Sequence, residues 1–151
     1  AFLFTAFFVN TNFAQETFTQ PDAQVSVTLP AGWEYETTDK TMMASPKEGG
    51  FFVYFKVLSV DDLGVALEQA DAILAETVTN MKLGEAKADV VNGMNAISVE
   101  GTGDGTLFFI GVLDTPVANS SMLVWAMGTT EVINKYGTEI VSILTSIKPA
   151  E

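Results

Sequence analysis

Five acidic residues in predicted loops have the side-chain type needed to bind a divalent cation. Asp61 and Asp62 are adjacent, Asp104 lies between two glycines, and Asp39 and Glu48 occur in other loops. Carboxylate oxygens are preferred ligands of Ca²⁺ and Mg²⁺, which makes Asp61, Asp62 and Asp104 candidate metal ligands. The sequence has no EF-hand series of ligands, and an acidic residue before a helix commonly caps that helix. We therefore expect Asp61 or Asp62 to cap a helix and Asp104 to lie in a hairpin turn, with a divalent cation as the second interpretation.

A pair of carboxylates could also catalyse hydrolysis. Glu34 and Glu36 project from the same face of one predicted strand. A glycosidase needs two acids roughly 5 to 10 Å apart in one cleft. Acids at this spacing more commonly form a solvated strand face, so a carboxylate-based hydrolase is our third interpretation of function.

Other catalytic chemistries lack their residues in this sequence. The 151 residues include no His, no Cys and no Arg. These absences exclude an imidazole base, a thiolate nucleophile, a cysteine-ligated metal and an arginine phosphate clamp. The glycine-rich segment Gly101–Thr106 precedes an apolar strand instead of opening a helix, so we interpret it as a turn and not as a phosphate loop. We expect a protein that is not an enzyme and has no cofactor.

The charge balance restricts the partners. Seven lysines and 19 acidic residues give a net charge of −12. Nucleic-acid binding depends on neutralising phosphates with basic side chains, so we expect no nucleic-acid partner. A cationic partner is electrostatically easier to accept.

Residues 1–14 have the pattern of a signal peptide without its front end. An apolar run over residues 1–9 is followed by polar residues and Ala14, and it is too short to cross a bilayer. We expect cleavage after Ala14 or Gln15, export to the periplasm or the extracellular space, and no membrane anchor after cleavage; the alternative is a buried N-terminal strand or helix. Residues 15–24 are predicted to form a flexible tail, and residues 25–149 a single domain.

Hydrophobic periodicity predicts strands before, between and after two helices. One apolar stripe runs from Leu63 to Met81, and a second runs from about Thr130 to Ile147, where Pro149 ends it. Asn92-Gly93 is a strong hairpin signal, which favours antiparallel pairing. The predicted strands are Val25–Leu29, Trp33–Thr37, Thr41–Ser45, Phe51–Val60, Glu85–Val91, Met94–Gly101, Thr106–Leu113 and Ser121–Met127. Several are apolar on both faces, so we expect an α+β fold: a mainly antiparallel sheet with helices on both faces, an α/β/α sandwich.

Aromatic residues on the predicted strands are candidates for a ligand or partner surface. They are Trp33, Tyr35 and Tyr54, with Phe52 and Trp125 near them in the pattern. Aromatic side chains on sheet faces more commonly belong to the core.

Three stretches resemble the PsbP-like family in their sequence and order. They are Leu29–Trp33, with its Pro-Ala-Gly-Trp turn, Asn92–Gly101, and Ile143–Pro149. This family includes the extrinsic subunit of photosystem II, a nuclear-import factor that binds the GTPase Ran, and bacterial envelope proteins. The resemblance covers roughly residues 24–149 and implies the same sandwich. These motifs belong to the fold and carry no catalytic residues, and the sequence lacks the lipid-attachment cysteine of many bacterial relatives.

Together these observations favour a non-enzymatic exported module of the cell envelope whose partner is another protein. The alternative is a carrier of a small ligand or a divalent cation, with a pocket between the sheet and a helix and acidic loops around it.

Overall fold

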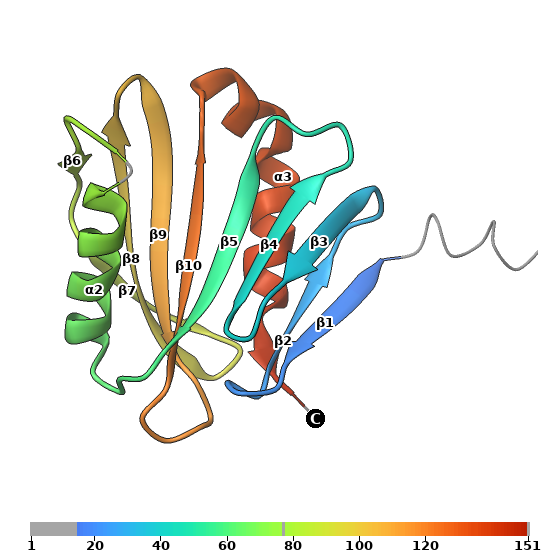
Figure 1. Ribbon diagram of the computed structural model, residues 1–151, viewed down its shortest axis with the longest axis vertical. Coiled ribbons are helices and arrows are strands. Elements are labelled where there is room, and N and C mark those ends of the chain that lie inside the picture. The colour runs from blue at the N-terminus through green and yellow to red at the C-terminus, as the bar shows by residue number, and fades with distance from the viewer. Residues whose placement is uncertain (1–14, 77, 151) are drawn as a thin grey trace, which may run out of the picture.

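The computed structural model describes residues 15–76 and 78–150 and contains one large and one small antiparallel sheet (Figure 1). The large sheet has eight strands. In spatial order they are β3 (Trp33–Thr37), β4 (Thr41–Pro46), β5 (Phe52–Leu58), β10 (Ser121–Gly128), β9 (Thr106–Asp114), β8 (Met94–Gly103) and β6 (Lys82–Leu83), and β7 (Lys87–Val91) also pairs with β8. The described residues also form the helices α2 (Leu63–Ala75) and α3 (Thr130–Ser146). The prediction of an α+β fold with a large antiparallel sheet is confirmed.

The small sheet corrects the prediction of a flexible tail. It contains β1 (Glu16–Gln20), β2 (Val25–Leu29) and β11 (Lys148–Pro149). Residues 16–20 look like a tail because an edge strand is largely exposed and therefore polar. Hydroxyl pairs across β1 and β2 add to the backbone ladder, with Thr17 and Thr28 at 3.1 Å and Thr19 and Ser26 at 3.0 Å. The predicted signal segment, residues 1–14, lies outside the described residues.

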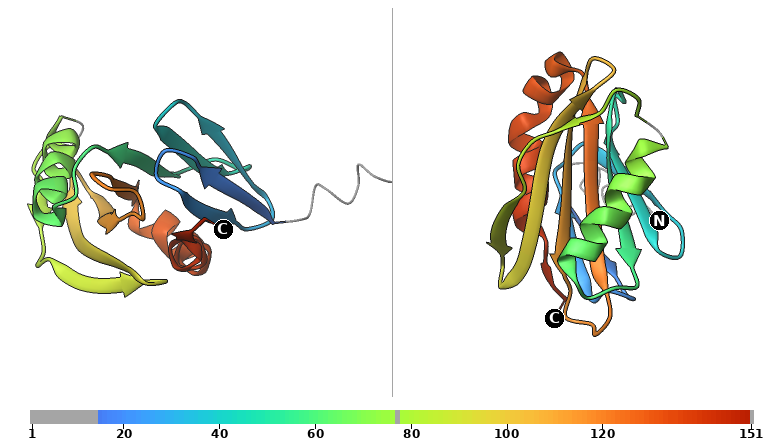
Figure 2. Two further views of the ribbon diagram at one scale, coloured as in Figure 1. Left: turned by 90° about the horizontal axis from the view of Figure 1, so that it is seen from below. Right: turned by 90° about the vertical axis from the view of Figure 1, so that its left-hand side faces the viewer.

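Strand β10 contributes to two separate hydrophobic clusters. Met122, Val124 and Ala126 pack in the first cluster with the small sheet and the buried face of α3, whereas Leu123 and Trp125 pack in the second cluster with α2. Side chains alternate between the faces of a strand, so each face of β10 contributes to a different cluster. Figure 2 shows α3 between the large and small sheets. It also shows α2 at the end of the large sheet that lies away from the small sheet, near β8 and β9.

Helix α2 begins as predicted but ends earlier. The Asp62 carboxylate accepts a hydrogen bond from the Val65 amide at 3.0 Å, so Asp62 is the N-cap. The apolar stripe predicted a helix as far as Met81, which was wrong because α2 ends at Ala75. Val78 is nevertheless buried in the second cluster. The periodic pattern continues past the helix because the segment that follows it packs on the same core.

Helix α3 matches its predicted apolar stripe. Thr129 caps its first turn by accepting a hydrogen bond from the Val132 amide, and Tyr136, Ile140 and Ile143 are buried. Pro149 follows the helix as expected, but Lys148 and Pro149 then pair with β2 as the short strand β11. A two-residue strand is defined by its partner, so the local sequence carries little signal for it.

Candidate binding groove beside helix α3

An apolar groove lies between α3 and strands β7, β8 and β9. It contains two adjoining hollows of about 400 and about 460 Å³. Phe109, Val141 and Leu144 line both. The first hollow also contacts Asp89, Val91, Asn92, Ala96, Ser98, Gly111, Leu113, Thr145 and Ile147, and the second also contacts Glu100, Leu107, Ile133, Gly137 and Ile140.

The alternation of β8 and β9 builds the floor of the groove. Leu107, Phe109 and Gly111 lie at alternate positions of β9 and therefore share one face of the sheet. Their cross-strand partners on β8 are Thr102, Glu100 and Ser98, in the same order. A Cβ atom on Gly111 would lie 3.2 Å from the Phe109 ring, so the missing side chain leaves room for that ring. Phe109 consequently lies between the two hollows.

Gly137 keeps the helix wall of the second hollow open. A Cβ atom there would meet nothing within 4 Å, and its φ is not in the left-handed region. Glycine inside a helix costs about 1 kcal/mol relative to alanine. Neither a steric clash nor the backbone conformation requires glycine at this position. The consequence of having glycine here is that the space beside the helix stays open.

Asn92 joins the two walls of the groove. Its side-chain amide donates hydrogen bonds to the carbonyl oxygens of Thr145, at 2.9 Å, and Ile147, at 2.7 Å. Thr145 lies in the last turn of α3 and Ile147 is the C-cap, where carbonyl acceptors lack partners within the helix. The β7–β8 turn is thereby attached to the end of α3.

Each hollow has one carboxylate. Asp89 lines the first hollow and Glu100 lines the second, and the described lining residues include no lysine. Asp89 pairs with Ala96, which lies four residues from Glu100 along β8. This arrangement gives an apolar groove with a negative rim.

The candidate metal ligands lie at different places. The Asp61 carboxylate accepts a hydrogen bond from the Ser120 amide at 3.0 Å, and Asp62 caps α2. Asp104 accepts hydrogen bonds from the amide and hydroxyl of Thr79, which lower the pKa of its carboxyl. Asp61 and Asp62 precede α2, whereas Asp104 contacts the segment after it. Within residues 15–76 and 78–150, no three acidic side chains gather to hold a metal ion.

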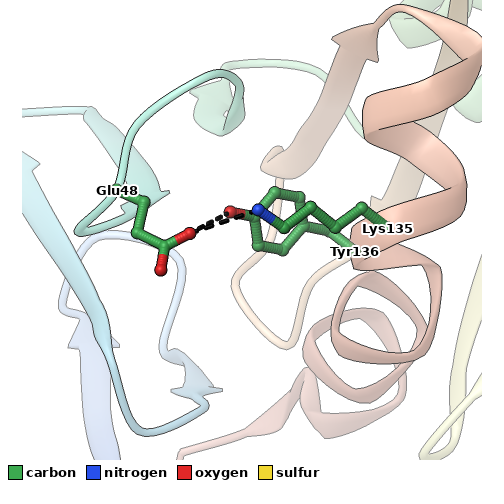
Figure 3. Close-up of polar contacts among 3 residues, drawn as sticks. All are labelled: Glu48, Lys135 and Tyr136. Atoms are coloured by element: carbon green, nitrogen blue, oxygen red, sulfur yellow. Dashed lines mark hydrogen bonds and ion pairs between the residues drawn. The ribbon is translucent and has the colours of Figure 1, made fainter.

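The remaining acidic candidates also lie outside the groove. Glu34 and Glu36 are exposed on the edge strand β3. Glu48 accepts hydrogen bonds from the Lys135 ammonium at 3.2 Å and the Tyr136 hydroxyl at 3.3 Å (Figure 3). The bond and charge of Lys135, followed by the Tyr136 bond, lower the pKa of Glu48. Glu48 therefore attaches the β4–β5 loop to α3, with a lysine already beside its carboxylate.

The three aromatic candidates do not share a surface. Trp33 is buried and packs edge-to-face with Phe51, with 5.6 Å between the ring centroids, as expected for an aromatic residue of the core. Tyr35 is partly exposed and contacts Phe18 on the side of the small sheet. Tyr54 packs on Trp125 in the second cluster, on the other face of the large sheet.

The sequence interpretation placed a pocket between the sheet and a helix but did not name its residues. Phe109 and Gly111 belong to a strand that reads as core on both faces. The one sequence feature that could have indicated the groove was Gly137, because a glycine inside an amphipathic helix suggests that packing or function requires it.

Comparison with solved structures identifies the fold. No family model and no curated protein sequence matches the chain. Cyanobacterial PsbP (CyanoP) from Synechocystis sp. PCC 6803 is similar with a TM-score of 0.65 and 9% identity, over 89% of this chain and 92% of that one. The Ran-binding protein Mog1p of Saccharomyces cerevisiae gives a TM-score of 0.57 at 9% identity, over 92% and 97%. LpqN of Mycobacterium tuberculosis, involved in cell envelope biogenesis, gives 0.56 at 12% identity, over 97% and 96%.

The chain has a PsbP-like fold. Three stretches of sequence thus indicated correctly a likeness that overall identity of 9 to 12% hides. The PsbP-like fold occurs in proteins of different roles, so it assigns no function by itself. In the described part of the chain, neither helix has the length and hydrophobicity needed to cross a bilayer.

Proposed function

We propose that this protein is a non-catalytic accessory module that binds another protein of the cell envelope through the groove beside α3. The observation that carries the proposal is an open apolar surface on both walls of that groove. Val141 is 59% exposed in its helix wall, and Leu107 and Phe109 in its sheet wall are partly exposed. Contiguous exposed apolar surface of this kind marks interaction sites. A Ran-binding protein and an envelope-biogenesis protein among the similar folds support a binding role.

We propose that residues 25–149, together with β1 paired to β2, act as one module with α2 and α3 on opposite faces of the large sheet. The two clusters that β10 supplies support this arrangement. Export to the periplasm or extracellular space is proposed from the apolar run and Ala14 in residues 1–14. Intact-mass measurement of the protein recovered from outside the cytoplasm tests export: a mature chain beginning at Gln15 or Glu16 supports it, and an uncleaved cytoplasmic chain contradicts it.

Site-specific photo-cross-linking tests the binding function. A photoreactive amino acid at Val141 samples the groove, and one at Val65, which is 44% exposed on α2, is the matched control. Both variants are expressed in the source organism and cross-linked in intact cells. A discrete protein adduct formed at position 141 but not at 65 supports the proposal. Identical adducts, or none at either position, contradict it.

The size of the hollows favours a small-ligand carrier as the second candidate. Volumes of about 400 and 460 Å³ are in the range of small-molecule sites. Such sites usually bury most of their ligand, however, and this groove is open. Calorimetry with long-chain fatty acids tests the hollows, and calorimetry with Ca²⁺ and Mn²⁺ tests the cation proposed at Asp61, Asp62 or Asp104.

A further inference from the structure

We propose that the groove binds an amphipathic helix of the partner, with Lys or Arg residues flanking the helix's apolar stripe. This inference rests on the proposed protein-binding function and names the element that would be bound. It is carried by the spacing of the two hollows, the surface of α3 and the charge of the groove.

The spacing of the hollows fits the repeat of a helix. Gly111 lies beside the first hollow and Leu107 beside the second. Four strand residues span about 13 Å. A helix rises about 10.5 to 12 Å over seven to eight residues, so apolar side chains at i and i+7 or i+8 would enter the two hollows. Side chains at i+3 and i+4 would then contact Phe109 between them, as in other helix-in-groove complexes.

The surface of α3 allows close approach of a second helix. Ile133, Gly137 and Val141 are spaced by four residues and line the groove. Residues at this spacing form a ridge along a helix, and a bound helix packs against such ridges. Because Gly137 has no side chain, the ridge is interrupted at the second hollow and a bound helix could approach α3 more closely there.

The charge of the groove selects a basic helix. Asp89 and Glu100 provide one carboxylate beside each hollow, and the whole chain has a net charge of −12. One Asp89 oxygen already accepts the Val90 amide at 2.8 Å. Lys87 lies two residues along β7 on the same face and pairs with Ser98, so it adds one positive charge beside the two carboxylates and the groove keeps one net negative charge. A basic residue near each end of the apolar stripe would pair with these carboxylates and would speed association.

A strand added at the edge of the sheet is the competing mode. In the described residues β7 pairs with β8 alone, so its other edge is free. The two hollows lie over the face of the sheet instead of at this edge, and for that reason we assign the groove to a helix.

Binding of designed peptides to the purified protein tests the proposal. The probe is a fluorescein-labelled helical peptide with Leu at i, i+4 and i+7 and with Lys beside this stripe. One control peptide has the same composition with the stripe scrambled, the second has Glu in place of Lys, and the third alternates Leu and Lys to favour a strand. We expect the probe to bind at least tenfold more tightly than each control. Equal affinity for the scrambled peptide, or preference for the alternating peptide, would overturn the assignment.

Two variants locate the binding. Gly137→Leu fills the second hollow and should weaken probe binding at least tenfold while the thermal midpoint stays equal or rises, because a helix glycine is replaced. Ala72→Leu, at an exposed position of α2, is its control. The double variant Asp89→Lys and Glu100→Lys should weaken binding of the Lys probe tenfold and improve binding of the Glu peptide, whereas Glu68→Lys on α2 should change neither. Unchanged probe binding by both groove variants overturns the proposal.

The inference and the proposed function fail in different ways. A specific adduct at Val141 combined with no helix preference among the peptides would retain the binding function and reject the helix. Loss of the adduct would reject the function itself.

Discussion

Asp71 on α2 has a carboxyl oxygen that is buried and accepts no hydrogen bond in the described structure. Burial, and then the charge of Glu68, raise the pKa of Asp71 above its usual value of 3.8. The folded state therefore holds the proton more tightly than the unfolded state, and the ionised group destabilises the fold above that pH. We expect Asp71→Asn to increase the free energy of unfolding at pH 7, with the gain disappearing as the pH falls below about 3.8.

Urea denaturation at pH 7 and pH 3.5 measures this effect. Glu85→Gln, at an exposed position between α2 and β7, is the control. Equal stability of Asp71→Asn and the unmodified protein at pH 7 would contradict the argument.

The Glu48–Lys135 ion pair gives the opposite dependence on pH. The pKa of Glu48 is lowered from 4.5, so its stabilisation is present above pH 4.5 and is lost as the pH falls through the lower folded value. Both side chains are exposed, at 75% and 59%, so salt should screen the attraction. We expect a double-mutant cycle with Glu48→Gln and Lys135→Met to give a small coupling at pH 7 that vanishes at pH 3 and in about 1 M NaCl. Coupling that persists in that salt would show that the contact is not mainly electrostatic.

At the scale of elements, Asn92 determines how the β7–β8 hairpin is held against α3. Asn92→Asp removes the amide donor while keeping a residue type that tolerates the φ of 48° found there. Losing two hydrogen bonds should cost about 1 to 3 kcal/mol, and the new charge beside the negative end of α3 acts in the same direction. Chemical denaturation measures the loss. Asn119→Asp, at another Asn with positive φ (59°), should cost less; an equal loss would assign the effect to the backbone conformation.

The elements that the sequence predicts well are those whose pattern is local. The run Phe51–Val60 indicates the strand observed at Phe52–Leu58, and Asn92-Gly93 indicates the hairpin between β7 and β8. The errors occur where a partner distant in sequence decides the structure. Strand β1 exists because β2 is beside it, and the end of α2 is followed by Thr79, whose amide donates to Asp104 across 25 residues.

At the scale of the whole molecule, β1 protects the edge of the small sheet. Strand β2 pairs with β1 on one side and β11 on the other. Without residues 15–20, a chain starting at Pro21 would expose the β2 edge and remove Phe18 from Tyr35. Unpaired edges associate with other chains, so we expect this truncated chain to form oligomers or aggregates. Light scattering with the chain starting at Gln15 as reference measures this outcome, and a stable truncated monomer would contradict it.

The groove shows the limit of sequence reasoning at this scale. Its walls come from β7–β9 and α3, and no local pattern reports the distance between them. The type of site was within reach, because acidic residues and apolar strands suggested a pocket between sheet and helix. The residues of the site could not be predicted, because Phe109 and Leu144 have the pattern of ordinary core residues in the sequence. Only the folded structure shows that they are partly exposed.

The division of the hydrophobic side chains by the large sheet has a consequence for motion. Helix α2 is anchored by the small residues Ala66 and Ala70 and by Leu74, whereas α3 buries Tyr136 and two isoleucines. Because the two groups do not share their contacts, one side can open while the other stays intact. Native-state hydrogen exchange should therefore show the α2 amides exchanging through a local opening of low free energy, with the central β10 amides protected up to global unfolding. Equal protection in α2, α3 and β10 would mean that the molecule opens only as a single cooperative unit.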